Sequence, residues 1–298
     1  MKSMKATVVG CGAIGKFLMI LLSKKSIFVQ GWTKKREKFL KFFFTEKSFV
    51  FQINNKKHLK NSKIVFFCTK AQDSHLAILN IIKYIKKSAF IFLLSNGLGI
   101  VEKISRIKNP IVLGFTTHSV TELHKNTIKV NYFGEFNIGP STKMKKEQER
   151  LIIRINQKYL NFIWHKNIQI PIWKKFTANC VINPLTVLYN CKNGKLIKFK
   201  KKISKICKEI FNLIKAQNIS IKYKNLFFYV IQIIEYTKEN TSSMLQDIKK
   251  NKKSEIDYLN GYVLKISKKY HFSCPNNEKI FKKIKKIEKK IKIKNRNF

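Results

Sequence analysis

The sequence predicts an α/β protein with an N-terminal Rossmann-type doubly wound sheet followed by an all-helical C-terminal domain. Two observations lead to this prediction. Short apolar strands alternate with helical segments through the first half of the chain, and the second half shows helical patterns only. We expect residues 1–167 to form the sheet domain and residues 168–298 the helical domain, with no long linker between them.

The chain begins with an apolar strand that enters a glycine-rich turn. Residues 6–22 read ATVVGCGAIGKFLMILL, so a strand, a turn and an apolar helix follow one another. In such turns the first glycine allows the sharp bend, the second lets the backbone approach a pyrophosphate, and the third lets the helix pack closely. The unpaired N–H groups of the helix N-terminus favour an anion. The turn predicts a nucleotide-phosphate cradle, although an ordinary βα turn would look similar. Its expected cofactor-binding residues are Gly10, Cys11, Gly12, Ala13, Ile14 and Gly15.

The second strand, residues 27–34, bears on which dinucleotide binds. An NAD site places an acidic residue about twenty residues after the glycines to bind the ribose 2′-hydroxyl, whereas a 2′-phosphate needs cations. This strand ends without a carboxylate and continues into Lys34, Lys35 and Arg36. We therefore expect NADPH/NADP+ as the cofactor. Basic residues are common throughout the chain, so the missing acid is the stronger observation.

Three further apolar runs, residues 63–68, 89–94 and 111–115, predict buried strands of a parallel sheet. Ser74 is expected to cap the helix after the first of them. Ligands of doubly wound sheets bind beyond the carboxyl ends of the strands. The residues at these ends are therefore candidate ligands: Lys70, Asn96 and residues 116–120. Short strands within 127–140, a helix at 144–160 and a strand at 162–164 complete the predicted domain.

Composition excludes several classes of protein. The formal net charge of +46 suggests a nucleic-acid or membrane partner. However, the basic residues are spread along the whole chain, and only five are arginine, the residue favoured for base readout. The six cysteines show no CxxC pair, so we expect neither a metal site nor a disulfide framework. With no room for a signal peptide and no apolar run long enough to span a bilayer, we expect a cytoplasmic protein without specific nucleic-acid or membrane partners.

A polar stripe marks the start of the second domain. Lys175, Asn179 and Asn183 are spaced four residues apart, so on a helix they fall on one face among apolar neighbours. Such a stripe on a mostly buried helix costs desolvation unless a polar partner faces it. A bound substrate would serve as this partner, and hydrogen bonds from core amides to nearby loops would serve equally well.

Glu255 is a second candidate, because it precedes an apolar helical segment in a chain that has only 16 acidic residues. A carboxylate at this position is equally explained by a favourable interaction with a helix N-terminus.

Several blocks of the chain resemble the ketopantoate reductase (2-dehydropantoate 2-reductase) family. They occur in the family's order and cover nearly the whole chain. The blocks NCVINPLT (179–186) and SSMLQD (242–247) are far more specific than the glycine turn. The blocks are GCGAIG (10–15), SNGLG (95–99), WKKFTANCVINPLT (173–186), Asn193-Gly194, SSMLQD (242–247) and EIDY (255–258).

The resemblance implies NADPH-dependent reduction of 2-dehydropantoate to (R)-pantoate in pantothenate and coenzyme A biosynthesis. By position, Lys175 resembles the family's general acid, and Glu255 resembles a carboxylate close to cofactor and substrate. Lys34 stands where the family often has Arg, which keeps the charge but not the planar fork. The implied substrate-binding residues are Asn96, Lys175, Asn179, Asn183, Asn193 and Ser243. The implied cofactor contacts outside the glycine turn are Lys34, Lys70, Asn96, Val120 and Glu255.

Two alternatives remain open on the sequence. The first is another two-domain NAD(P)-dependent dehydrogenase that acts on a different 2-keto or 3-hydroxy acid. The second, from another class, is a nucleic-acid-binding protein, which only the high charge suggests. The sequence does not distinguish a monomer from a homodimer.

Overall fold

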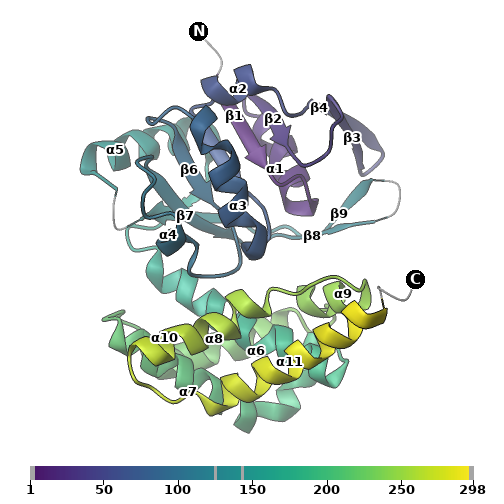
Figure 1. Ribbon diagram of the computed structural model, residues 1–298, viewed down its shortest axis with the longest axis vertical. Helices are drawn as coiled ribbons and strands as arrows, with labels where there is room; N and C mark the ends of the chain where they lie inside the picture. The colour runs from purple at the N-terminus through teal and green to yellow at the C-terminus, as the bar shows by residue number, and fades with distance from the viewer. Residues whose placement is uncertain (1–3, 124–125, 142–143, 295–298) are drawn as a thin grey trace. The chain divides into compact units, whose positions relative to one another are not determined.

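The computed structural model describes residues 4–123, 126–141 and 144–294. Its contacts divide the chain into two compact units. The first consists of Met1–Ser95 with Ile100–Ile168, and the second of Asn96–Gly99 with Gln169–Phe298. Figure 1 follows the chain through both by colour. The four residues Asn96–Gly99 therefore belong by their contacts to the helical unit, although sheet residues flank them in sequence.

The described part of the first unit is built on a seven-stranded sheet with strand order β11-β10-β7-β6-β5-β1-β2. All neighbouring pairs are parallel except β10 and β7, which are antiparallel. The order runs outward from β1 in both directions, as in a doubly wound sheet. The strands are β1 (Met4–Val9), β2 (Ile27–Trp32), β5 (Ile64–Phe67), β6 (Phe90–Leu93), β7 (Ile111–Thr116), β10 (Phe136–Pro140) and β11 (Ile163–Trp164).

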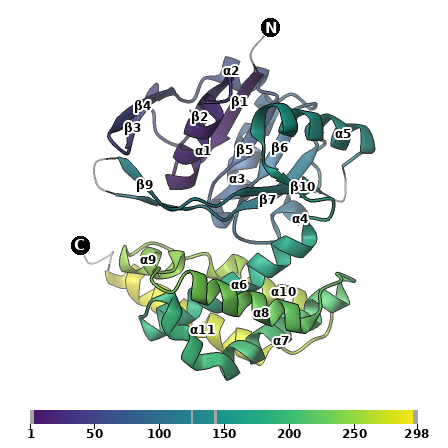
Figure 2. The ribbon, with the colours of Figure 1, turned by 180° about the vertical axis from the view of Figure 1, so that it is seen from behind.

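Helices cover both faces of this sheet. Figure 1 shows α3 in front of it, and Figure 2, from behind, shows α5 in front. The central strands β5 and β6 are buried along their whole length, which explains why they read as continuous apolar runs. The helical elements of this unit are α1 (Ala13–Ser23), α2 (Lys56–Asn61), α3 (Ala71–Ile81), the 3₁₀ turn η1 (Ile82–Tyr84), α4 (Ile100–Lys103), α5 (Lys146–Ile155) and the π turn η2 (Asn156–Leu160).

Two details differ from the sequence-based expectation. Ser74 does not cap α3 but lies inside its first turns, where its hydroxyl bonds the Lys70 carbonyl at 3.0 Å. The helix begins earlier, at Ala71, with Lys70 at the N-cap position. The expected helix at 144–160 starts at Lys146 and changes to a π turn before Asn161, which adopts a left-handed conformation (φ 56°).

A second sheet of four strands, with order β4-β3-β9-β8, lies within the described residues of the first unit. The strands are β3 (Phe39–Phe44), β4 (Lys47–Gln52), β8 (Ser119–Glu122) and β9 (Thr127–Tyr132). The sequence analysis predicted β9 but missed β3, β4 and β8. Leu40 and Phe42 are buried while Phe39, Lys41 and Phe43 are exposed, so the alternation of a one-sided strand is present but hidden among aromatic residues.

The described part of the second unit is helical apart from its turns. Its core gathers buried aliphatic residues from α6, α7, α8 and α10, with partly buried aromatic residues at its margin. Its elements are α6 (Gln169–Tyr189), the 3₁₀ segment η3 (Asn193–Phe199), α7 (Lys200–Ala216), α8 (Tyr223–Tyr236), α9 (Ser243–Lys249), the 3₁₀ turn η4 (Ile256–Tyr258), α10 (Asn260–Lys269) and α11 (Pro275–Lys294).

A buried polar network links four of these helices. Pro184 lies inside α6 and has no N–H, so the carbonyl of Cys180 loses its helical partner. Asn260 Nδ2 donates to this carbonyl at 3.1 Å and to Asn277 Oδ1 at 2.9 Å. Asn277 Nδ2 then donates to Glu209 Oε2 on α7 at 2.7 Å. The network therefore satisfies the group that the proline leaves unpaired and connects α6 with α10, α11 and α7.

Glu209 also closes the N-terminus of α11. Its Oε1 accepts from the backbone N–H of Asn276 at 2.8 Å, and its Oε2 accepts from that of Asn277 at 3.0 Å. Pro275 occupies the first position of the helix, where a missing N–H costs nothing. A carboxylate against the first N–H groups of a helix is a favourable arrangement. In the described part of the chain, no helix combines the length and apolar character that a bilayer span requires.

Candidate active site

The glycine turn lies where β1 meets α1, as predicted. Gly10 has a φ of +92°, and a Cβ there would lie 2.7 Å from Thr69 Cγ2 and 2.9 Å from Thr69 N. A Cβ on Gly15 would lie 2.0 Å from the Gly10 carbonyl oxygen. Only glycine fits either position, because one needs the left-handed region and the other a close approach of helix to turn.

The turn fits a phosphate-bearing ligand. Gly12 is the N-cap of α1, and a Cβ there would meet no atom within 4 Å, so the backbone is open on this side. No side-chain hydrogen bond caps the helix, and its first turn contains no acidic residue. The first N–H groups of α1 are therefore available to an anion, as a dinucleotide pyrophosphate requires.

The Cys11 side chain packs into the protein. Its Sγ lies 3.8 Å from the Trp32 carbonyl oxygen. A Cβ on Gly31 would lie 2.7 Å from this sulfur. Burial raises the pKa of this thiol to about 11, against smaller opposing effects of a backbone hydrogen bond and nearby lysines. Cys11 thus offers a ligand its backbone and not a reactive thiolate. Ala13 and Ile14 form the start of α1 and are partly buried.

Lys34 lies just beyond β2 and is almost fully exposed, with a side-chain accessibility of 96%. Its Nζ lies 3.7 Å from Oδ1 of Asp73, a residue in the first turn of α3. The sequence argument for NADPH rested on the absence of an acid at the end of this strand. The fold brings an acid there from another element, which local sequence could not show.

The other two cofactor candidates of the first unit lie at element boundaries. Lys70 is the N-cap of α3, directly after β5 and Thr69. Val120 lies in β8, pairs with Val130 of β9 at a register shift and packs against the core of this unit. The segment 116–120 therefore spans the end of β7 and the start of the second sheet.

In the second unit, three predicted site residues meet although they are far apart in sequence. The Nζ of Lys175, on α6, donates to Oδ1 of Asn96 at 3.1 Å. The Nδ2 of Asn96 donates to Oε2 of Glu255 at 3.4 Å. The Asn96 amide thus bridges the ammonium and the carboxylate, and its flipped orientation would reverse both hydrogen bonds unfavourably.

The surroundings tune the acidity of Lys175. Burial lowers the pKa of this lysine to about 8, and the negative charge of Glu255 opposes that shift. An ammonium group with this pKa is still mostly protonated at neutral pH, yet it is a stronger acid than an exposed lysine. Such a group is suited to general acid catalysis.

Glu255 does not act as the helix cap that the sequence left open. It precedes η4, but its side chain makes no capping hydrogen bond there. Its backbone carbonyl accepts from the N–H groups of Tyr258 at 2.9 Å and Leu259 at 3.1 Å. The 8% exposed side chain instead faces Asn96. The loop of Asn96 is held beside this segment, since Leu98 N–H donates to the Tyr258 carbonyl at 3.4 Å.

The remaining substrate candidates of the second unit have different surroundings. Asn179 and Asn183 lie on α6 with Lys175, so the predicted helix is present, and Asn183 is buried whereas Asn179 is half-buried. Asn193 is buried at the start of η3, where its Nδ2 donates to Thr237 Oγ1 at 2.9 Å and its Oδ1 has no partner. Ser243 is exposed as the first residue of α9.

Sequence reasoning missed a buried lysine beside the glycine turn. Lys16, on α1, is 3% exposed at its side chain, and its Nζ forms an ion pair with Glu122 of β8. The ammonium also lies 5.5 Å from the centroid of the Phe42 ring. The signal was a lysine inside an otherwise apolar helix, which a chain with 62 basic residues conceals.

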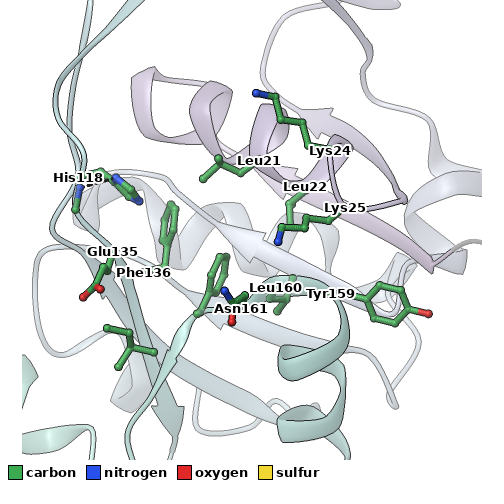
Figure 3. Close-up of a pocket in the computed structure, with 13 residues that line it drawn as sticks. Leu21, Leu22, Lys24, Lys25, His118, Glu135, Phe136, Tyr159, Leu160 and Asn161 are labelled. Carbon is green, nitrogen blue, oxygen red and sulfur yellow. Dashed lines mark hydrogen bonds between the residues drawn. The ribbon is translucent and has the colours of Figure 1, made fainter.

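A pocket of about 280 Å³ lies at the opposite end of α1 from the glycine turn (Figure 3). Leu21, Leu22 and Phe136 contribute apolar lining, and Lys25 extends over it toward Asn161. At its edge, Nδ1 of His118 accepts from Gly134 N–H at 2.9 Å, and burial lowers the pKa of this histidine. Of the lining residues, only His118 belongs to a segment predicted to bind a ligand, residues 116–120.

The doubly wound sheet, its glycine cradle and the helical unit define a Rossmann-type protein of the dinucleotide-binding class. Residues 6–143 match the family described as "Ketopantoate reductase PanE/ApbA", and residues 167–288 match "Ketopantoate reductase PanE/ApbA C terminal". The chain is 32% identical over 290 residues to the 2-dehydropantoate 2-reductase of Yersinia pestis, covering 96% of this chain and 95% of the relative. The chain belongs to the ketopantoate reductase family.

Solved structures agree on the fold. A PanE/ApbA family ketopantoate reductase from Ralstonia eutropha JMP134 superposes with a TM-score of 0.85 at 20% identity, covering 97% of this chain and 100% of the other. A D-mandelate dehydrogenase in complex with NADH and anilino(oxo)acetate superposes with a TM-score of 0.86 at 21% identity and the same coverage. The fold is therefore shared by enzymes with different substrates.

Proposed function

We propose that this protein reduces 2-dehydropantoate to (R)-pantoate with NADPH, a step of pantothenate and coenzyme A biosynthesis. Family membership supports the substrate. The relative from Yersinia pestis is named 2-dehydropantoate 2-reductase, and it matches this chain over nearly its whole length. The observation that supports the chemistry is the cluster of Lys175, Asn96 and Glu255, in which burial lowers the lysine pKa to about 8.

In this proposal the chain's residues divide the work between them. The α1 N-terminus binds the pyrophosphate, and Lys34 meets the 2′-phosphate. A bound NADPH supplies a hydride from C4 of its nicotinamide to the ketone carbon. As negative charge develops on the ketone oxygen, the protonated Lys175 stabilises it and donates a proton.

The neighbours of Lys175 set its orientation and charge. Asn96 Oδ1 directs the ammonium, and the Glu255 carboxylate favours the protonated form. Asn179 and Asn183, on the same helix, offer amide groups to the hydroxyl and carboxylate groups of the substrate. Asn193 and Ser243 complete the proposed substrate contacts, and Lys70 and Val120 the cofactor contacts.

The deciding experiment is a steady-state assay of the purified protein with 2-dehydropantoate and a panel of other 2-keto acids, each with NADPH and NADH. We expect the highest kcat/KM for 2-dehydropantoate with NADPH. The structural likeness to D-mandelate dehydrogenase favours one alternative, a reductase of 2-keto acids with an aromatic side chain. Higher kcat/KM with phenylglyoxylate, or with NADH, would contradict the corresponding part of the proposal.

Two further proposals concern partners. A dimeric ketopantoate reductase from Staphylococcus aureus shares the fold, and we propose that this chain is a monomer or a homodimer, which sedimentation can distinguish. We also propose that the charge of +46 serves no specific nucleic acid. Binding that vanishes near physiological salt would support this, because non-specific phosphate contacts depend steeply on salt.

A further inference from the structure

The buried carboxylates of the described residues are Glu209, Glu255 and Glu288. Burial of an ionised carboxylate is costly unless hydrogen bonds and opposite charges replace its water. Glu209 closes the N-terminus of α11, and Glu255 faces Asn96. Glu288 lies on α11 among lysines, is 7% exposed, and has no place in the proposed chemistry. Its burial therefore calls for a separate explanation.

Glu288 bonds the residue that directly precedes Glu255. Its Oε1 accepts two hydrogen bonds from Ser254, one from the backbone N–H and one from the hydroxyl, both at 2.8 Å. The Ser254 hydroxyl also accepts from the backbone N–H of Ile256 at 3.2 Å. One carboxylate oxygen of the C-terminal helix thus holds the backbone N–H of Ser254 directly and that of Ile256 through the Ser254 hydroxyl.

A lysine strengthens the same attachment. Lys285 Nζ lies 3.1 Å from Oε2 of Glu288 and 3.0 Å from each carboxylate oxygen of Asp257. Burial by itself lowers the pKa of Lys285, but hydrogen bonds with Asp257 and Glu288 outweigh this effect and raise the pKa. Lys253 Nζ lies 3.4 Å from Oδ2 of Asp257. Residues on both sides of Glu255 are therefore fastened to α11.

Because both neighbours of Glu255 are fixed, its side chain has a set starting direction. The carbonyl of Glu255 is occupied by the N–H groups of Tyr258 and Leu259, so the backbone has little freedom to rotate. The carboxylate reaches Asn96, which in turn orients Lys175. A chain of direct contacts therefore leads from Glu288 through Ser254 and Glu255 to Asn96 and Lys175.

We propose that Glu288 is a positioning residue for the reaction: by holding Ser254, it directs the Glu255 carboxylate toward Asn96 and Lys175. This inference rests on the proposed function of Lys175 as the proton donor. It assigns a role at the site to the lysine-rich helix α11, which contributes none of the proposed substrate contacts.

The test compares two substitutions at one position. Glu288→Met removes the acceptor at nearly constant length, and Glu288→Gln keeps one carbonyl oxygen that accepts from both Ser254 groups. We expect Glu288→Met to lower kcat roughly tenfold, within the loss that a misplacement of about 1 Å causes, and to leave KM for NADPH unchanged. The alkaline fall of its kcat profile moves to lower pH, because Glu255 then supports the Lys175 ammonium less. Glu288→Gln retains most of kcat and the wild-type pH profile.

Two matched controls separate positioning from stability. Glu209→Gln weakens the attachment of the same helix at its other end, at a buried glutamate that does not touch Ser254. Glu278→Gln removes an exposed pair with Lys282 on the same helix. We expect a lower Tm for Glu209→Gln, and a wild-type pH profile for both. If Glu288→Met folds poorly, Ser254→Ala serves as a milder test. We expect it to shift the pH profile in the direction expected for Glu288→Met.

Amide hydrogen exchange provides a readout that needs no substrate. Faster exchange at residues 254–259 in Glu288→Met than in Glu278→Gln supports the attachment. Unchanged exchange there, or a Glu288→Met enzyme with lowered Tm but wild-type kcat and pH profile, overturns the positioning role. If wild-type protein reduces no 2-keto acid while exchange responds as expected, the proposed function fails and the attachment stands as a structural one.

Discussion

Two lysines in different units of this protein, the buried Lys16 and the half-buried Lys175, have different surroundings. Lys16, in α1, meets the carboxylate of Glu122 and the face of Phe42. Lys175, in α6, donates to the amide oxygen of Asn96, and burial lowers its pKa to about 8 despite the charge of Glu255. Lys16 forms an ion pair with a carboxylate, whereas at Lys175 the loss of water outweighs the effect of the Glu255 carboxylate on the pKa.

This difference separates a structural lysine from a chemical one. A lysine paired with a carboxylate connects two elements, here α1 and β8. A lysine whose burial outweighs the effect of a nearby carboxylate gives up its proton more easily, which is what a general acid near neutral pH requires. Substituting each of these two lysines in turn is the most direct way to test the comparison.

The largest effect is expected for Lys175→Ala. We expect kcat for 2-dehydropantoate to fall at least a hundredfold, within the range of about 10²–10⁴ for a lost general acid. NADPH binding, measured by fluorescence titration, should be largely kept. The same substitution at Lys16 should reduce kcat far less. Unchanged turnover in Lys175→Ala would remove this residue from the mechanism.

The next effect concerns pH. Because the lowered pKa of Lys175 is about 8, its ammonium is present below pH 8 and is lost as the pH rises through that value. The kcat of ketone reduction should therefore be level near neutrality and fall about tenfold per pH unit above pH 8. Oxidation of pantoate needs the neutral amine, so its kcat should rise over the same interval. A reduction rate that stays constant to pH 10 would contradict the assignment.

Lys16→Met tests the structural lysine. The substitution keeps the aliphatic stem but removes the charge-assisted hydrogen bond to Glu122, which contributes about 1.5–3 kcal/mol in comparable cases. We expect the lower end of this range, because Glu122 is 41% exposed and water can solvate it. Urea unfolding should show the loss in the free energy of unfolding. A variant that is as stable as wild type yet catalytically impaired would contradict the distinction between the two lysines.

The smallest effects are expected at Lys34, which is exposed and pairs with Asp73 only at 3.7 Å. Exposed charge interactions are worth about 0.2–1 kcal/mol, so Lys34→Gln should raise KM for NADPH by up to about fivefold. KM for NADH should stay the same. Asp73→Asn should lower KM for NADPH slightly, since it removes a negative charge beside the expected 2′-phosphate. Equal changes for both cofactors would show that Lys34 does not read this phosphate.

Much of the fold could be predicted because its signals are local. The buried strands β5 and β6 read as apolar runs, and the glycine turn read as a turn before an apolar helix. The second sheet was largely missed, because exposed aromatic residues such as Phe39 and Phe43 obscure the alternation in β3. Asp73 beside Lys34 and the pairing of Lys16 with Glu122 could not be predicted, since each joins residues that are distant in sequence.

The sequence by itself determined the order of the buried strands, the helical character of the second half, the positions where only glycine fits, and the resemblance to one family of reductases. These depend on backbone sterics and hydrophobic periodicity, which act over a few residues. Only the tertiary structure decided which polar groups meet. It placed Asn96 and Glu255 beside Lys175, supplied Asn260 to the carbonyl left open by Pro184, and set Glu288 against Ser254. Such contacts follow from the packing of whole helices, which brings charges and amides together from segments that no local pattern relates.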